Sequence, residues 1–107
     1  MPVSNVVPFQ PTVAATLRII REVAQDSSRI RLGPAMPTVF SVGVSLRQIL
    51  NCLKNGSISN GPHLDEVGFV CCELEWITAG RRIRVVVSVE GRKPPDRFLH
   101  VLFAEEV

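Results

Sequence analysis

The sequence lacks an apolar run that approaches the roughly 18 residues a membrane-spanning helix needs. Its start carries no basic segment and contains Pro2, Pro8 and Pro11, so a secretory signal peptide is not expected. These absences argue against membrane and exported proteins. We expect a cytoplasmic protein with no membrane partner.

Motifs for metal binding or covalent catalysis are also missing. Cys52, Cys71 and Cys72 are odd in number and lack the spacing of metal ligands. With two histidines, His63 and His100, and no third clustered ligand, a metal site is not expected. No glycine-rich phosphate loop follows a strand. We therefore expect no metal and no cofactor, and we interpret the cysteines as reduced packing thiols.

Neither sign of charge is in large excess, because the formal net charge is only +2. Its distribution along the sequence is uneven, however. The basic residues of one region are Arg81, Arg82, Arg84, Arg92, Lys93 and Arg97. Such a group could attract RNA phosphates, or it could be a solvated hairpin end. The sequence leaves both interpretations open.

Apolar residues make up 46% of the 107 residues, which indicates either a generous core or an apolar surface that waits for a partner. The length favours a single domain. We expect residues 1–10 to form an extended arm, because proline restricts its neighbours to extended conformations. Val6, Val7 and Phe9 are then candidate partner-binding residues, and the partner could be a second copy of the chain in a homodimer.

The strongest structural signal is a hairpin over residues 67–90. Apolar residues alternate along both arms, which is typical of half-buried strands. With Ala79 and Gly80 as the turn, Trp76 faces Ile83, and every apolar residue has an apolar partner. The members of this apolar set are Val70, Cys72, Leu74, Trp76, Ile83, Val85, Val87 and Val89.

Helices are predicted on both sides of a proline-rich stretch. Residues 11–25 have apolar residues at helical spacing, and residues 45–55 begin with a capping box of Ser45 and Gln48. We expect Gly56 to end the second helix in a left-handed conformation. Its predicted core stripe contains Leu46, Ile49, Leu50 and Leu53. A short helix over residues 37–43 and a strand over residues 29–32 are weaker predictions.

Residues 57–66 are expected to form a loop, with a short strand around Ile58 as the alternative. Residues 98–104 are expected to form a last strand that turns Leu99, Val101 and Phe103 to the core. The prediction is an α+β fold: two main helices on one face of a three- to four-stranded antiparallel sheet, with residues 11–107 as one domain. The other sheet face would carry Glu75 and Arg84, which we expect to form an opposite-charge pair across the hairpin, and also His100. An enzyme could use such a surface to bind a phosphate, with Arg84 as the neutralising group and His100, or His63 in its polar loop, as general acid or base.

Three segments together resemble a small bacterial family of uncharacterised domains. They are 44–58 (VSLRQILNCLKNGSI), 61–68 (GPHLDEVG) and 79–87 (AGRRIRVVV). That family is similar to the RelE, MqsR and BrnT type toxins, which are compact ribonucleases. The resemblance implies a RelE-like fold, a metal-free ribonuclease that cleaves RNA on the sheet face, and a neutralising antitoxin as partner. The catalytic candidates would then be His63, His100 and Arg84, and the six basic residues would contact RNA.

The sequence departs from the family pattern in one segment. Relatives carry His-Ala-x-x-Arg-Met-x-x-Arg-Gly before the capped helix, whereas Pro34, Thr38 and Val42 replace the histidine and both arginines here. Two hypotheses follow. The chain is a toxin-like domain that binds or cleaves RNA, or it is a non-enzymatic protein-binding module, such as an inhibitor or accessory protein of a phage or mobile element.

Overall fold

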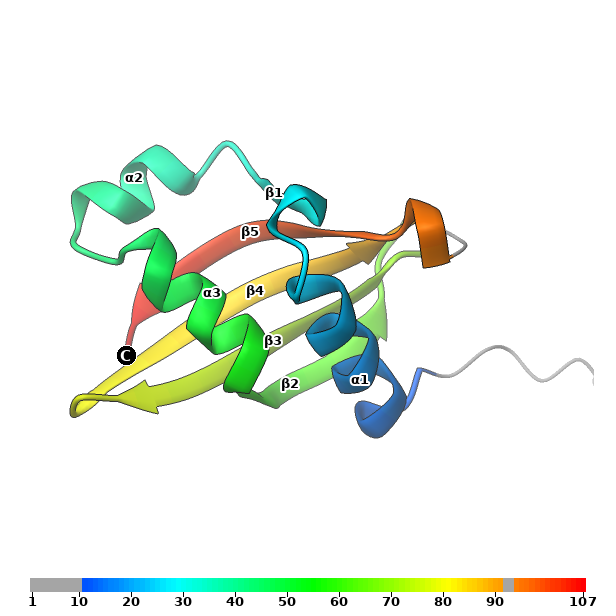
Figure 1. Ribbon diagram of the computed structural model, residues 1–107, viewed down its shortest axis with the longest axis horizontal. Helices are drawn as coiled ribbons and strands as arrows, with labels where there is room; N and C mark the ends of the chain where they lie inside the picture. The colour runs from blue at the N-terminus through cyan, green and yellow to red at the C-terminus, as the bar shows by residue number, and fades with distance from the viewer. Residues whose placement is uncertain (1–10, 92–93) are drawn as a thin grey trace, which may run out of the picture.

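The structure, a computed structural model, describes residues 11–91 and 94–107 as helices on one face of a curved sheet (Figure 1). The helices are α1 (Val13–Ala24), α2 (Met36–Ser41) and α3 (Leu46–Asn55). The strands are β1 (Ile30–Leu32), β2 (Ser57–Leu64), β3 (Val70–Thr78), β4 (Arg81–Glu90) and β5 (Phe98–Glu106). Their order in the sheet is β1-β5-β4-β3-β2.

The α+β class is confirmed, but the prediction of a three- to four-stranded antiparallel sheet was wrong. The sheet has five strands, and β1 pairs with β5 in parallel while the other pairs are antiparallel. The third helix, the short α2, lies where the sequence predicted a short helix over residues 37–43. No helix of the described residues is long and apolar enough to cross a membrane.

The strand β2 occupies the segment that was predicted to be a loop. It pairs with β3 from Ser57 opposite Glu75 to Leu64 opposite Val70, with irregularities on both sides of Asn60. An edge strand accepts Pro62 because its outward side needs no hydrogen-bond donor. Asn60, Gly61 and Pro62 are typical of a turn, so the sequence did not predict a strand of this length. It forms because β3 lies beside it.

The β3–β4 hairpin has the predicted register. Val70 pairs with Val89, Trp76 with Ile83, and Thr78 with Arg81. Ala79 and Gly80 both have positive φ angles, of 50° and 76°. This is the conformation of two-residue hairpin turns that match the twist of the strands.

The helix α3 begins as predicted and ends differently. Ser45 accepts a hydrogen bond from the Gln48 backbone, and the Gln48 side chain accepts one from the Ser45 backbone. Gly56, however, is extended, with φ −72° and ψ 172°, so the left-handed end was a wrong prediction. The reason for glycine is space, because a Cβ there would lie 2.6 Å from the Cys52 carbonyl oxygen.

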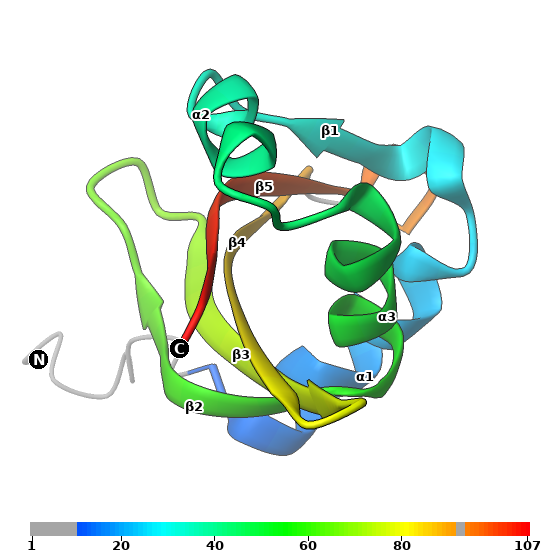
Figure 2. The same cartoon turned by 90° about the vertical axis from the view of Figure 1, so that its left-hand side faces the viewer.

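The core lies between the inner face of the sheet and helices α1 and α3, around which the sheet curves (Figure 2). Ile49 and Leu53 of α3 are fully buried, but Leu46 is 43% exposed, so its place in the core stripe was wrong. Buried residues of α1 are Thr16, Ile20, Val23 and Ala24.

The last strand, β5, turns Phe103 outward, which the sequence did not predict. Val86 pairs with Phe103 and Val87 with Val101, so Leu102 is an extra residue in a bulge. A bulge of this kind reverses the alternation of side chains beyond it. Ala104 is therefore buried and Phe103 is 39% exposed, although the sequence predicted Phe103 in the core.

Candidate functional site

Two surfaces are candidates for function: the outer face of the sheet and an apolar groove beside α2. On the outer face, strand pairing aligns one polar row across all five strands. The row is His63, Cys71, Ser88, His100 and Arg31. Both predicted histidines lie in it, but three strand spacings separate them, which is about 14 Å.

His100 is held on two sides. Its Nδ1 atom lies 2.9 Å from the Glu90 Oε2 atom, a hydrogen bond that is partly buried. On the other side, an ideal Cβ on Gly33 would lie 3.2 Å from His100 Nε2. When Nδ1 carries the proton and donates it to Glu90, Nε2 is left as the acceptor. This geometry suits an oriented acid or base.

Ser88 and Cys71 lie beside His100 in the same row. The Ser88 hydroxyl is buried and has no hydrogen bond of ordinary geometry within the described part of the chain. Burial raises the pKa of the Cys71 thiol, and the nearby Ser88 hydroxyl partly offsets that rise. A thiol in this state is a poor nucleophile at neutral pH.

Arg84 lies apart from the histidines, four residues along β4 from Ser88, or about 13 Å. Its guanidinium is 3.3 Å from Glu75 and 3.7 Å from Glu105. The predicted cross-strand pair of Arg84 and Glu75 is therefore confirmed. Two carboxylates therefore already pair with the Arg84 guanidinium, which a bound phosphate would need.

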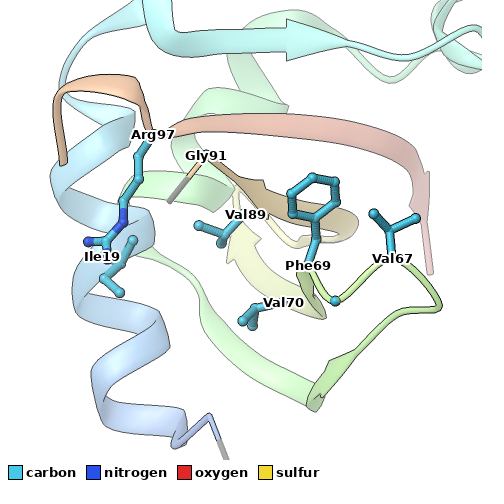
Figure 3. A pocket seen from close by; sticks show the side chains of 8 residues that line it. Ile19, Val67, Phe69, Val70, Val89, Gly91 and Arg97 are labelled. Carbon is cyan, nitrogen blue, oxygen red and sulfur yellow. The ribbon is translucent and has the colours of Figure 1, made fainter. Parts of the chain in front are cut away.

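The described members of the basic group lie at opposite ends of β4. Arg81, Arg82 and Arg84 are near the β3–β4 turn, whereas Arg97 follows the other end of this ten-residue strand, about 30 Å away. Arg97 points towards Ile19 of α1 and lines a pocket of about 360 Å³ on the helix side of the sheet (Figure 3). Arg92 and Lys93, like Val6, Val7 and Phe9, lie outside the described residues.

The net charge of the outer face does not favour a polyanion. Its carboxylates are Glu73, Glu75, Glu90 and Glu105. Its arginines are Arg31, Arg82 and Arg84. Carboxylates thus outnumber arginines there, and RNA binding would depend on local contacts at His100 and Arg31.

The second surface is an apolar groove of about 400 Å³ where β1, α2 and the start of α3 meet. Its lining contains Leu32, Phe40, Gly43, Val44, Ser45 and Leu46. Leu32, Phe40 and Leu46 are 42%, 39% and 43% exposed, and the neighbouring Val42 is 72% exposed. Large apolar side chains gathered in this way indicate a surface that another molecule covers.

The groove contains part of the proline-containing segment at residues 34–43. Phe40 and Gly43 belong to residues 34–43, and Pro37 lies in the first turn of α2. Protein binding was one of the two hypotheses from the sequence, but the groove itself was not predicted. Helical spacing placed Leu46 in the core stripe, and only the positions of β1 and α2 show that it is left half-exposed.

Glu90, Ser88 and Arg31 were not predicted as site residues. Glu90 could have been predicted from the sequence. It lies at the end of the predicted hairpin, and His100 lies on the strand that follows in antiparallel order. Arg31 could not be found in this way, because a parallel pairing between residues 31 and 100 leaves no local pattern.

The chain matches no family model, no curated protein and no solved structure. Within residues 11–91 and 94–107, no three or more His, Cys, Asp or Glu side chains are grouped so that they could hold a metal ion. The two surfaces are therefore interpreted from their own geometry.

Proposed function

We propose that this protein is a protein-binding module that holds an apolar segment of a partner in the groove beside α2. The observation that carries the proposal is the group of half-exposed Leu32, Phe40 and Leu46 around one hollow. Covering each such side chain completely would contribute part of the roughly 1.5–3 kcal/mol of full burial. Three together could anchor a short segment.

The replaced segment at residues 34–43 supports the same proposal. A histidine and two arginines would make this region polar in relatives, whereas Pro34, Thr38 and Val42 stand here. We propose that the chain derives from a RelE-like fold and now acts as an inhibitor or accessory protein. A meander of β2 to β5 with helices on one face is compatible with that origin.

A displayed library of random peptides tests the proposal. Peptides are selected on the wild-type protein and then tested against a Phe40→Ser/Leu46→Ser variant. Both side chains are exposed, so the variant should fold, which circular dichroism and urea unfolding would check. We expect peptides that lose binding to the variant but keep it with an Ile77→Ser control. Ile77 is 58% exposed on the outer face, away from the groove.

If selection returns no peptide that depends on Phe40 and Leu46, the groove is not a binding site. Peptides that bind the wild type and the Phe40→Ser/Leu46→Ser variant equally would point to another surface and would also contradict the proposal.

A second function, metal-free RNA cleavage, is favoured by one observation: the hydrogen bond between His100 and Glu90 beside Arg31. His100 would take the proton of the ribose 2′-hydroxyl, whose oxygen attacks the adjacent phosphorus as the bond from phosphorus to the 5′-oxygen breaks. The proton taken up by His100 would return, directly or through water, to that leaving oxygen, and Arg31 would neutralise the charge on the phosphate. Its guanidinium carbon lies 3.8 Å above the Phe98 ring, which holds it in place. The surplus of carboxylates on the face makes this the second candidate.

Incubation with single-stranded RNA separates the candidates. If the protein cleaves RNA, His100→Ala should abolish the activity and Glu90→Gln should lower it by about ten- to a hundredfold, because imidazole orientation is lost. His63→Ala and Arg84→Ala test the other predicted catalytic residues, and the distances predict a smaller effect for both. No cleavage by the wild type, and no binding that weakens with salt, would exclude this function.

A further inference from the structure

The pocket beside Arg97 lies where the helix layer meets one end of the sheet. Its volume of about 360 Å³ is within the range of small-molecule sites, which is roughly 300–1,000 Å³. Its apolar walls include Ile19 of α1, Val70 at the start of β3 and Val89 near the end of β4 (Figure 3). Ile19 and Val70 are only partly buried. An apolar molecule of small size would cover them.

Arg97 is the one charged side chain among the described residues that line this pocket. Its side chain extends along the pocket towards Ile19 (Figure 3). Within residues 11–91 and 94–107, its guanidinium makes no ion pair and no hydrogen bond. A guanidinium offers five N–H donors in a planar arrangement that matches a carboxylate. The pocket therefore combines apolar walls with one cation that can accept an anionic partner.

The carboxylates of the segments that form the pocket do not neutralise this arginine. Asp65 accepts hydrogen bonds from the backbone N–H groups of residues 67–69, and Glu90 is hydrogen-bonded on the outer face of the sheet. Glu22 and Asp96 are exposed, and neither forms an ion pair in the described part of the chain. The hydrogen bonds to Asp65 also occupy the N–H groups of the loop, so the arginine is the main donor that the pocket offers.

The backbone at Arg97 is held on two sides. Its carbonyl oxygen accepts a hydrogen bond of 2.9 Å from the Arg29 Nε atom. On the other side lies Gly91, which has a φ angle of 85°, and an ideal Cβ there would lie 2.9 Å from the Arg97 Cα atom. A side chain that starts from a fixed backbone loses less conformational entropy when it binds a ligand.

We infer that this pocket binds a small organic monoanion, a carboxylate joined to a compact apolar body. The carboxylate pairs with the Arg97 guanidinium, and the apolar body covers Ile19, Val70 and Val89. A phosphate dianion takes more hydrogen-bond donors than one arginine supplies, and an uncharged molecule leaves the cation without a partner. The inference does not depend on the proposed function, since α2 and the start of β5 lie at opposite ends of the molecule (Figure 1).

Titration of the protein with hexanoate, followed by its amide NMR signals, tests the inference. We expect saturable shifts for Gly68, Val70 and Gly91. The alcohol 1-hexanol has the same chain without the carboxylate and should bind about tenfold more weakly or less. Equal affinity for hexanoate and 1-hexanol would mean that the arginine takes no part and would contradict the inference. So would the absence of saturable shifts, or shifts confined to residues 43–46, which would place the probe in the groove.

Removal of the charge on the protein gives a matched comparison. Arg97→Met keeps an apolar stem in the pocket, so it should weaken hexanoate binding roughly ten- to a hundredfold and leave 1-hexanol binding nearly unchanged. Arg82→Met is the control, because Arg82 is exposed at the other end of β4 and makes no ion pair in the described ranges. Equal weakening in both variants would show a general charge effect and contradict the inference.

Two measurements on the wild type remain decisive if Arg97→Met fails to fold, which circular dichroism would show. The first is the comparison of hexanoate with 1-hexanol. The second is competition with inorganic phosphate, which has the charge but no apolar body and should not displace hexanoate at equal concentration. Displacement by phosphate as effective as by a second carboxylate, such as pentanoate, would reduce the pocket to a general anion site and contradict the inference.

Discussion

The three cysteines show how a single side chain's surroundings set its chemistry. Cys52 and Cys72 are buried in the core, and burial raises the pKa of each thiol to about 12. The carboxylate of Glu75 adds to the effect at Cys52, and the Cys71 and Glu73 side chains add to it at Cys72. The sequence interpretation of these residues as packing thiols agrees with this environment.

These pKa values predict how stability depends on pH. Below the ordinary thiol pKa of about 9, both folded and unfolded chains keep their protons, so the thiols favour neither state. Between about pH 9 and 12 the unfolded chain loses protons that the folded chain keeps. The free energy of unfolding should therefore fall with rising pH, by up to about 1.4 kcal/mol per pH unit for each buried thiol.

Urea unfolding between pH 8.5 and 10 would measure this slope. The Cys52→Ala variant should show a shallower slope, because one of the two thiols is gone, even though its stability at pH 8 is lower. An unchanged slope in that variant would mean that Cys52 does not keep its proton in the folded state.

At the scale of elements, α3 combines a buried half with an exposed start. Leu46 and Leu53 lie on the same stripe, seven residues apart, yet Leu46 is 43% exposed and Leu53 is fully buried. The inward face of the helix is buried from Ile49 onward. The first residue lies before this buried part and lines the groove.

Alanine substitutions along α3 should reproduce this difference. Leu53→Ala should lower the free energy of unfolding by about 2–5 kcal/mol, because it leaves a cavity. Leu46→Ala should cost about 1 kcal/mol or less, since water already reaches the side chain. Urea unfolding of both variants checks this, and equal costs would show that the groove is closed in solution.

The end of α3 supports a second prediction. If Gly56 were left-handed, asparagine would be tolerated better than alanine. Because a Cβ would instead lie 2.6 Å from the Cys52 oxygen and 2.8 Å from the Glu75 oxygen, Gly56→Asn and Gly56→Ala should both destabilise, by about 1–3 kcal/mol or more. Thermal unfolding of both variants distinguishes a left-handed Gly56 from an extended one. A Gly56→Asn variant clearly more stable than Gly56→Ala would support the left-handed conformation.

Elements defined by local patterns were predictable from the sequence, and elements that depend on distant partners were not. The β3–β4 hairpin and the cap of α3 each show a pattern within a few residues, and both have the predicted geometry. The strand β2 was missed because its sequence resembles a turn, and the exposure of Phe103 was missed because a one-residue bulge has no signature. The groove escaped prediction because it forms from three elements that are adjacent only in the folded chain.

At the scale of the whole molecule, β5 is the strand on which the sheet depends. It pairs with β4 along its length and with β1 on its other side, where residues 30–32 meet residues 99–101. It also contacts α1 and α2. Loss of β5 would therefore uncouple β1 and α2 from the rest of the fold.

Two truncations test this dependence. A chain that ends at Glu90 lacks β5 and should remain largely unfolded, as judged by circular dichroism and by the dispersion of its amide NMR signals. A chain that ends at Ala104 loses the ion pairs of Glu105 and Glu106 but keeps the core residues Leu99 and Val101. We expect the shorter deletion to cost about 1–2 kcal/mol, because exposed ion pairs are individually weak. A folded chain ending at Glu90 would contradict this view.

The parallel pairing of β1 and β5 also has a consequence for the order of events on the ribosome. The segment with Leu32 and Phe40 leaves the exit tunnel well before the strand that anchors it, because β5 begins only at Phe98. Until β5 emerges, these apolar side chains stay unanchored in the nascent protein. The surface that we assign to a partner can therefore be completed only after β5 has emerged.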